Sequence, residues 1–537
     1  MIIRNKPPRT LKLDEPIIHR EAHKRPVTRR DFIAQGLMTG SATVIAPAAL
    51  SLLLNPTRAM ALDPDILAQK IACGITGGAG KIPFICFDLN GGGNIAGSNV
   101  LVGGAGGQTD FLTTAAYGKM GLPGSMVPTA SATGNFIENR LGLLFHSDSA
   151  HVRGILERTA PSTQAFTNGV VLPALSNNDT NTNPHNPMYG IAKVGAKGEL
   201  LTLIGSQAST SGGNSMAPLS MVDPTLTPTV VNQASNVTGL VDTGVLGQLF
   251  SNPADAVSVL ESMSRISGQK FGNVSTQLST DAAVKSAANC NYVKSAYLAE
   301  NFSSPAALNP DLDPMIVDQS STRGTGIFSQ AEYQANSDFR MTAAVAKMVI
   351  SGYAGAGTIQ LGGYDYHGQG RSTGELRDLN AGRCIGACLE YAARMQKPLM
   401  VYVFSDGGIS ANGQVDTSVD GRNKFMWSSD NESVASTYFL VYNPTGRPQL
   451  LDGAGGLPAA RHQQIGAFTP DGSVDAASSP AASNVLLLVQ TVLLNYMALH
   501  GQQAQFPQLF PDQALGNGSA LDALTAFAPI VNGKIGG

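Results

Sequence analysis

Two apolar runs in the C-terminal half of the chain, each ending in a polar and glycine-rich motif, constrain its fold most strongly. Residues 358–361 lead into Gly-Gly-Tyr-Asp-Tyr-His at 362–367, and residues 399–404 lead into Ser-Asp-Gly-Gly at 405–408. A stretch with helical character separates the two runs, which predicts a β-α-β unit. In α/β sheets, ligands bind just beyond the carboxyl ends of the strands. We therefore expect a functional site where these two runs end.

The rest of the chain also alternates between strand-like and helical stretches. We expect further strands at residues 81–89, 200–204 and 437–442, and helices at 140–158, 254–271, 282–301, 335–354 and 485–499. This alternation predicts an α/β fold with a mostly parallel central sheet, helices on both faces and long loop insertions. Because no stretch has the composition of a linker, we expect residues 62–537 to form a single α/β domain with a polar insertion near 206–236.

The first 61 residues have the pattern of an export signal. Thr-Arg-Arg-Asp-Phe-Ile at 28–33 precedes a weakly apolar run at 36–54 and Ala-Met-Ala at 59–61. A charged segment, an apolar segment and a small-residue cleavage pattern are typical of a twin-arginine signal peptide. We expect residues 1–61 to be this signal and the mature protein to be periplasmic or secreted. Twin-arginine export moves folded proteins, often with a cofactor inserted, which directs attention to metal ligands.

Charge and hydropathy argue against two other classes of protein. Charged residues make up 14% of the chain, the formal net charge is −3, and most local basic clusters lie within residues 1–61. We expect no nucleic-acid partner, since such binding needs a concentrated basic surface. The apolar run at 485–499 is interrupted by Gln490 and Asn495 and is too short to span a bilayer. We therefore expect no transmembrane segment in the mature chain, and a buried core helix at 485–499.

The cysteines allow two interpretations. The chain has five, and in an oxidising compartment an odd number leaves at least one unpaired. Cys384 and Cys388 stand four residues apart on a predicted helix and share one face. This pair is compatible with a metal or redox site. No third ligand stands at a suitable spacing, so we favour two small residues of the core.

Four features occur along the chain in one order. They are the twin-arginine signal, Asn-Gly-Gly-Gly-Asn at 90–94 after the first strand, Gly-Gly-x-Asp-x-His at 362–367, and Ser-acidic-x-Gly at 405–408. The chain thereby resembles the exported bacterial family labelled domain of unknown function 1501, which is related to the alkaline phosphatase and sulfatase superfamily. The resemblance covers residues 82–453, and the motif at 362–367 is its sharpest part. It implies an alkaline phosphatase-like core with metal ligands at the strand ends.

The resemblance also implies a set of metal ligands. Asp365 and His367 match the acid and imidazole of Gly-Gly-x-Asp-x-His, and Asp406 matches the acid of a segment usually written Ser-Glu-Phe-Gly. Asp430 lies in the stretch that corresponds to the family's Gly-Thr-Asp-His-Gly segment. These four residues could hold one divalent metal ion, whose identity the sequence leaves open. The alternative is that Asp365 and His367 hydrogen-bond a loop and fix its shape.

Two positions depart from the family pattern. Asn94 stands where relatives usually carry an acid, with Asp88 as a displaced substitute, and Asn431 stands where the histidine is usual. Amide oxygens can bind hard cations but contribute no charge. We therefore expect a reduced site with one ion and not two, and we retain Asp88 and Asn94 as further candidate ligands.

No motif identifies a nucleophile, and Cys-x-Pro-x-Arg, which would identify a sulfatase, is absent. The hydroxyl candidates in the first-half loops are Thr109, Thr113, Ser125 and Ser131. Other histidines could be ligands: two flank Asp148 on a predicted helix and one lies in a proline-containing turn. For the first two, His146 and His151, we favour surface or capping roles. The third, His185, could approach the site from above, but we favour a role in its turn.

Two functions remain open on this sequence. The amide replacements, the missing nucleophile motif and the long polar loops favour a non-catalytic envelope protein that binds a partner or polymer. The alternative is a metal-dependent hydrolase of phosphate or sulfate esters, in which the ion activates a loop hydroxyl. Convergence of the candidate ligands in space is the observation that separates a metal centre from scattered polar residues.

Overall fold

The computed structural model describes residues 62–73, 80–130, 135–176, 183–240, 253–273, 275, 281–301, 308–319, 324–368, 370–531 and 533. Residues 62–537 form one compact unit. The predicted signal at 1–61 lies outside the described residues.

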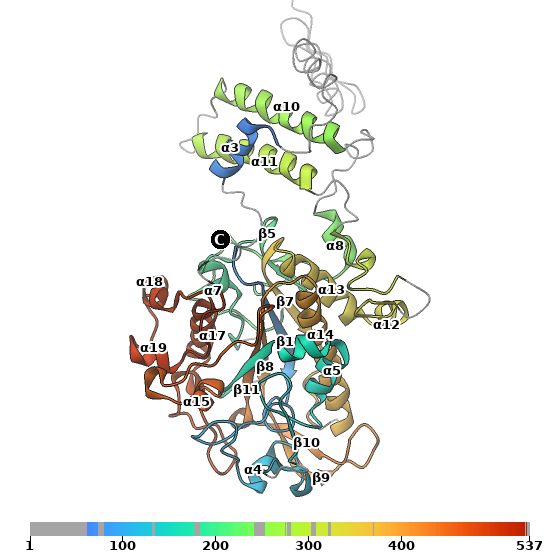
Figure 1. The fold of residues 1–537 in the computed structure, drawn as a ribbon, viewed down its shortest axis with the longest axis vertical. Helices are drawn as coiled ribbons and strands as arrows, with labels where there is room; N and C mark the ends of the chain where they lie inside the picture. The colour runs from blue at the N-terminus through green and yellow to red at the C-terminus, as the bar shows by residue number, and fades with distance from the viewer. Residues whose placement is uncertain are drawn as a thin grey trace, which may run out of the picture. The chain divides into compact units, whose positions relative to one another are not determined.

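A seven-stranded sheet with the order β4-β11-β8-β1-β7-β5-β6 lies at the centre of this unit (Figure 1). Its strands are β1 Phe84–Gly92, β4 Thr167–Pro173, β5 Leu201–Gly205, β6 Thr229–Val230, β7 Ala354–Leu361, β8 Leu399–Gly407 and β11 Ser436–Tyr442. β1 pairs in parallel with β7 and β8, and β5 pairs in parallel with β6 and β7. Only β11 runs antiparallel to its neighbours β8 and β4. The predicted α/β fold with a mostly parallel sheet is confirmed.

The strands β1, β7, β8, β11 and β4 are buried on both faces almost throughout, and alternate residues enter different cores. On β1, Ile85 and Phe87 belong to one apolar cluster, whereas Phe84 and Cys86 belong to the other. This period of two follows from the pleat of a β-strand. Both faces are therefore covered, as expected for a sheet that is mostly parallel.

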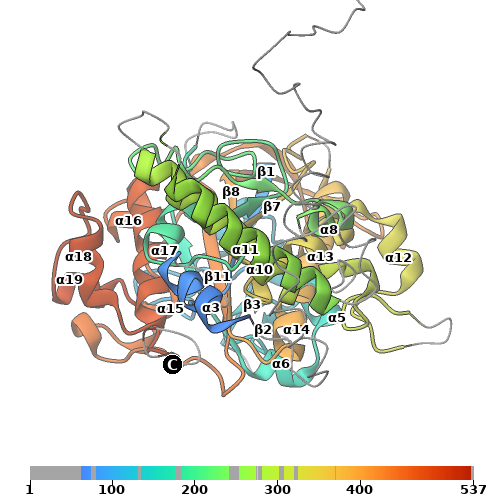
Figure 2. The ribbon, with the colours of Figure 1, turned by 90° about the horizontal axis from the view of Figure 1, so that it is seen from above.

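Helices cover the two faces of the sheet (Figure 2). The first face carries α5 Ala150–Arg158, α13 Ser337–Ile350 and α14 Arg371–Arg394, and α14 is the connection between β7 and β8. The second face carries α7 Met188–Lys193 and α17 Val485–Leu499. α17 has the bounds predicted for the buried core helix. No helix in the described part of the chain is both long and apolar enough to cross a membrane.

Shorter elements complete this part of the molecule. The hairpin strands are β9 Ile409–Val415 with β10 Phe425–Asp430, and β2 Ile137–Glu138 with β3 Phe145–His146. Short helices are α4 Thr114–Lys119, α6 Pro161–Ala165, α8 Ala234–Gly239, α12 Gln330–Ala335, α15 Ala459–Gln463, α16 Pro480–Ser483, α18 Phe506–Leu509 and α19 Ser519–Ala523. The 3-10 turns are η1 Gly124–Met126, η3 Pro310–Leu312, η4 Glu432–Val434, η5 Ala454–Gly456 and η6 Gln503–Gln505.

One expectation needs correction. The helix predicted at 140–158 begins only at Ala150, because the Ser149 side chain caps it by accepting from the backbone N–H of Val152. The residues before it form β3 and a turn. The polar insertion near 206–236 contains the buried residues Ser211 and Ser215, and its residues 229–230 add the edge strand β6 to the sheet.

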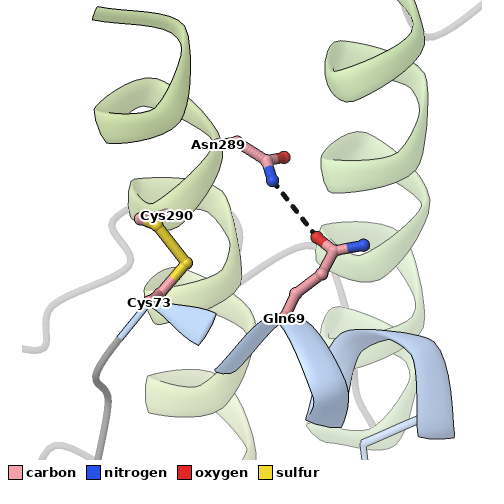
Figure 3. The surroundings of a disulfide bond; sticks show 4 residues. All are labelled: Gln69, Cys73, Asn289 and Cys290. Atoms are coloured by element: carbon pink, nitrogen blue, oxygen red, sulfur yellow. Dashed lines mark hydrogen bonds between the residues drawn. A yellow bond between two sulfur atoms is a disulfide. The ribbon is translucent and has the colours of Figure 1, made fainter. Parts of the chain in front are cut away.

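Three helices form a small lobe with a core of its own. They are α3 Pro64–Ala72, α10 Pro253–Gly272 and α11 Asp281–Asn301. A separate apolar cluster joins them: Leu62, Ile66, Val257, Leu260, Val293, Ala296 and Tyr297. A disulfide between Cys73 and Cys290 links the end of α3 to α11, and beside it Asn289 donates to Gln69 at 3.3 Å (Figure 3). The sequence analysis did not foresee this pairing.

The other three cysteines are free and buried. Cys384 and Cys388 lie on the buried face of α14 and belong to the core, as favoured from the sequence. Burial raises the pKa of the Cys384 thiol to about 12 and that of Cys388 well above its usual value. Neither thiol is therefore suited to redox or metal chemistry at neutral pH.

Candidate metal centre

Three of the four predicted ligands converge beyond the carboxyl ends of the central strands. Asp365, His367 and Asp430 each offer a ligand atom, and these atoms all lie within 4.8 Å of one another. Nδ1 of His367 lies 2.5 Å from Oδ1 of Asp365 and 3.1 Å from Oδ1 of Asp430. The three side chains are 35–55% exposed, so the group is open to solvent on one side.

Asp365 and His367 are held by the two tyrosines that alternate with them. Tyr364 and Tyr366 are both buried, in the loop that follows β7. The Tyr364 hydroxyl donates to the carbonyl of Arg377 on α14 at 3.0 Å, and the Tyr366 hydroxyl accepts from the backbone N–H of Asn94 at 2.8 Å. Because the tyrosines turn inward, the residues that follow each of them, Asp365 and His367, are presented to solvent. In this motif, buried tyrosines that anchor the loop therefore alternate with the candidate metal ligands.

The glycine end of β1 packs directly against the group. Gly91 has φ +101°, and a Cβ there would lie 2.6 Å from the backbone nitrogen of Asp365. A Cβ on Gly92 would lie 3.3 Å from Oδ1 of Asp430. Gly91 has a conformation that residues with side chains rarely adopt, and no room for one. The loop after β7 and the end of β10 can therefore come close to each other only because the residues between them, at the end of β1, are glycines.

Asp406, the fourth predicted ligand, lies outside the group of three. It is fully buried at the end of β8, where Oδ1 accepts from the backbone N–H of Gly91 at 2.9 Å. Its neighbour Ser405 accepts from the N–H of Gly93 at 2.9 Å and donates to the carbonyls of Leu89 and Gly91. Both polar residues of the Ser-Asp-Gly-Gly motif thus shape the glycine end of β1.

The two further candidates, Asp88 and Asn94, are buried and face other partners. Asp88 accepts from the backbone N–H groups of Asn214 and Ser215 at 2.7 and 2.8 Å, and from the Ser215 hydroxyl. It therefore anchors the polar insertion. Burial raises the pKa of Asp88 to about 6, against the lowering effect of these hydrogen bonds. Asn94 accepts from the Ser98 hydroxyl at 2.6 Å, and this bond fixes the glycine loop.

The other histidines have structural partners. His146 contacts the Met126 carbonyl at 2.8 Å and stacks on Phe136. Burial, together with the charge of Lys424, lowers the pKa of His146 to about 4. For His185, which stacks on Phe404, burial alone lowers the pKa to about 4. His146 is buried, so the surface role expected for it is wrong, whereas its acceptance from the backbone N–H of Asp148 at 3.1 Å fits the expected capping role.

His185 and His151 each contact a buried hydroxyl. His185 Nε2 lies 3.2 Å from the Ser176 hydroxyl, and Ser176 donates to the backbone carbonyl of Asp406 at 2.9 Å. His151 Nδ1 lies 3.2 Å from the hydroxyl of Tyr438 on β11. Both histidines are fully enclosed, at 0–1% exposure, and neither belongs to the group of three ligands.

The hydroxyl candidates give no clear nucleophile. Thr113 caps α4 by accepting from the N–H of Ala116, and it donates to the carbonyl of Pro470. Thr109 and Ser125 are exposed on loops, and Ser131 lies outside the described residues. The structure therefore places three of the four candidates and gives none of these a partner that would act as a general base.

A buried ion cluster that the sequence analysis missed holds the hairpin that carries Asp430. Glu375 on α14 bonds Lys424 at 2.7 Å and Arg371 at 2.8 Å. The Arg371 guanidinium lies 4.2 Å from the ring centre of Trp427 on β10. Burial alone would raise the pKa of Glu375, but the charges of Lys424 and Arg371 lower it to about 2. Arg371 and Glu375 stand four residues apart on α14, but Lys424 lies in the loop between β9 and β10, so no local pattern indicated that the three come together.

The three converging groups suit a divalent cation. Ligands bound at about 2.0–2.2 Å to one ion stand roughly 3 Å apart. The 3.1 Å between Nδ1 of His367 and Oδ1 of Asp430 fits this spacing, whereas the 2.5 Å between Nδ1 and Oδ1 of Asp365 is a direct ion-pair contact that must lengthen when an ion binds. Two carboxylates that meet at one imidazole repel each other unless positive charge lies between them. Two carboxylates and one imidazole match Zn²⁺ or Mn²⁺ better than Ca²⁺, which prefers oxygen ligands alone.

The chain matches none of the protein-family models, curated proteins or solved structures with which it was compared.

Proposed function

We propose that the protein is an exported, non-catalytic envelope protein that binds one divalent metal ion through Asp365, His367 and Asp430. The observation that supports this proposal is the convergence of their ligand atoms within 4.8 Å at the carboxyl ends of the central strands. Three protein ligands leave coordination positions open on the solvent side. In this account an oxygen atom of an envelope partner or polymer completes the shell of the ion.

Export is supported by two independent features. One is the twin-arginine pattern at residues 28–33 with its cleavage pattern at 59–61. The other is the disulfide between Cys73 and Cys290, because disulfides persist mainly in oxidising compartments such as the periplasm. The proposed location is therefore the periplasm or the exterior of the cell.

An alkaline phosphatase-like ancestry is part of the same proposal. Its support is the arrangement expected from the resemblance to domain of unknown function 1501, with candidate ligands beyond β7 and a polar motif at the end of β8. Asn431, one of the residues that depart from the family pattern, has a structural role. Asn431 caps η4 by accepting from the N–H of Ser433, so this amide is committed to a turn beside Asp430.

A hydrolase of phosphate or sulfate esters is the second candidate, and the open side of the group favours it. An ion with free positions can polarise an ester oxygen or activate water. We prefer the non-catalytic function because hydrolases of the alkaline phosphatase and sulfatase superfamily need a hydroxyl positioned as nucleophile. One candidate, Thr113, is engaged as a helix cap.

The test is metal content and affinity of the mature protein. We expect about one ion per chain after loading with Zn²⁺ or Mn²⁺, and loss of that ion in Asp365→Ala and Asp430→Asn. Asp223→Asn, which changes an exposed carboxylate bonded only to its own turn, is the matched control. A wild-type protein that takes up no ion from either solution would overturn the proposal. Turnover of aryl phosphate or aryl sulfate esters by the loaded protein would favour the second candidate.

A further inference from the structure

A buried carboxylate on α14 connects the segments that carry the candidate ligands. Asp378 is 4% exposed. Its Oδ2 accepts from the side-chain amide of Asn99 at 2.7 Å, and both of its oxygens lie 3.4 Å from the hydroxyl of Tyr366. Nε2 of His151 lies 3.6 Å from Oδ1. Three polar groups from three parts of the chain therefore surround one carboxylate.

These contacts reach the metal group through one residue. Tyr366 stands between Asp365 and His367 in sequence, and its ring is fully buried. Its hydroxyl donates toward Asp378 and accepts from the backbone N–H of Asn94 at 2.8 Å. The loop after β7 is therefore fixed to the glycine loop and to α14 by the same hydroxyl.

Asn99 makes the second connection to the glycine loop. The amide that donates to Asp378 also donates to the carbonyl of Asn94 at 2.7 Å. Its Oδ1 accepts from the hydroxyl of Ser149 at 2.9 Å and from the backbone N–H of His151 at 3.2 Å. The start of α5 is thereby joined to the same network.

A carboxylate that is 4% exposed is retained only with strong compensation, since an uncompensated buried charge is costly. Asp378 is not one of the three candidate ligands, and two of its partners, Tyr366 and Asn99, bond the backbone of Asn94 in the glycine loop. Such partners behind metal ligands orient the ligands and tune the affinity of a site.

We propose that Asp378 is a positioning residue of the metal centre: through Tyr366 and Asn99 it fixes the loop that presents Asp365 and His367. The inference rests on the proposed metal-binding function. It predicts that removing the charge or the hydroxyl weakens metal binding although all three ligands remain.

The test is a double-mutant cycle on metal affinity with Asp378→Asn and Tyr366→Phe. We expect each single variant to bind Mn²⁺ about 10- to 100-fold more weakly than wild type. If Asp378 acts through Tyr366, the two losses are not additive: the double variant should bind Mn²⁺ no more weakly than whichever single variant has the lower affinity. Asp338→Asn is the matched control, because Asp338 is a half-buried carboxylate on α13 that accepts from the side-chain amide of Asn380. It should lower stability without changing Mn²⁺ affinity.

Three affinity results would overturn the inference: wild-type affinity in Asp378→Asn, fully additive losses in the double variant, or an equal loss of affinity in Asp338→Asn.

Hydrogen exchange of residues 362–368 in metal-free protein is the second readout. Faster exchange in Asp378→Asn and in Tyr366→Phe, but not in Asp338→Asn, supports the step in which Asp378 fixes this loop, and it does so without reference to metal affinity. Unchanged exchange in both variants refutes it. Failure of the proposed function appears separately, as an absence of metal binding by the wild type. Should Asp378→Asn fail to fold, Tyr366→Phe alone decides.

Discussion

The candidate metal centre depends on residues that lack a side chain as much as on its ligands. Gly91→Ala places a Cβ 2.6 Å from the backbone nitrogen of Asp365 at φ +101°, so the loop after β7 must move away. We expect metal affinity to fall by at least about 10-fold, a typical loss when groups that orient ligands are disturbed. Calorimetric titration with Mn²⁺ measures this.

Gly362→Ala is the matched control for that substitution. A Cβ on Gly362 meets nothing within 4 Å, and its backbone lies outside the left-handed region. Its affinity should equal that of wild type. Equal affinities for all three proteins would mean that the glycine end of β1 does not shape the site.

Asp88 makes stability depend on pH in the direction opposite to an ordinary paired carboxylate. Its native pKa of about 6 exceeds the usual value of 3.8, because burial disfavours the charged form. The stability that Asp88 contributes is therefore full below about pH 4 and is lost as the pH rises through 6. The shift corresponds to roughly 3 kcal/mol, as an order of magnitude.

We therefore expect Asp88→Asn to remove this fall in the free energy of unfolding between about pH 4 and pH 7. Urea unfolding across that range measures the slope. The control is Asp223→Asn, in the same insertion but exposed, which should keep the wild-type slope. The same slope in Asp88→Asn and wild type would contradict the assignment.

At the scale of elements, the ion cluster between α14 and the β9–β10 hairpin should govern whether the hairpin stays in place. Glu375→Gln leaves Lys424 buried without a full counter-charge, and breaking a buried pair costs about 3–5 kcal/mol. The native pKa of Glu375, about 2, lies below its usual 4.5. Its contribution is thus present above about pH 4.5 and lost as the pH falls through 2.

Chemical unfolding at neutral and acid pH checks this prediction. Glu375→Gln should lose stability at pH 7, and the difference from wild type should shrink as the pH falls toward about 2. Glu332→Gln on α12 removes a one-third exposed partner of Arg158 and should cost much less. A loss in Glu375→Gln no larger than in this control would show that the cluster is not a structural clamp.

The elements that sequence predicts well are those with a local signal. The strands that begin β-α-β units are apolar runs, and α17 is an apolar run of helical length, so their positions follow from local composition. The antiparallel direction of β11 depends on where the chain returns to the sheet, which no local pattern encodes. The predicted helix at 140–158 was too long because residues before Ser149 pair across the chain.

The same distinction holds for the candidate site. Asp365 and His367 stand in a motif at a strand end, so their convergence was predictable. Asp406 occupies an equivalent strand end, but its side chain turns toward Gly91, and only the register of β1 against β8 decides this. The sequence did not indicate a role for Asp378, because a single acidic residue within a predicted helix is usually exposed to solvent.

At the scale of the whole molecule, the helical lobe should depend on its disulfide far more than the sheet does. Among the side chains that the structure describes, seven form the apolar cluster of this lobe, so its core is small beside those of the sheet. Replacing Cys73 and Cys290 by serine should cost the lobe about 2–4 kcal/mol. Hydrogen exchange should quicken in residues 62–73 and 281–301 and stay unchanged in α17.

Asn289→Ala is the matched control for the lobe. It removes the hydrogen bond to Gln69 beside the disulfide and leaves the covalent link (Figure 3). It should have only a small effect on exchange. Unchanged exchange of residues 62–73 in the double serine variant would show that apolar packing alone holds the lobe.

The most direct test of the metal centre is a crystal structure of the mature protein grown with Mn²⁺, with an anomalous difference map. We predict one strong peak at about 2.0–2.2 Å from ligand atoms of Asp365, His367 and Asp430, with the remaining positions facing solvent. A map without a peak there, with His367 still in direct contact with both carboxylates, would contradict the account.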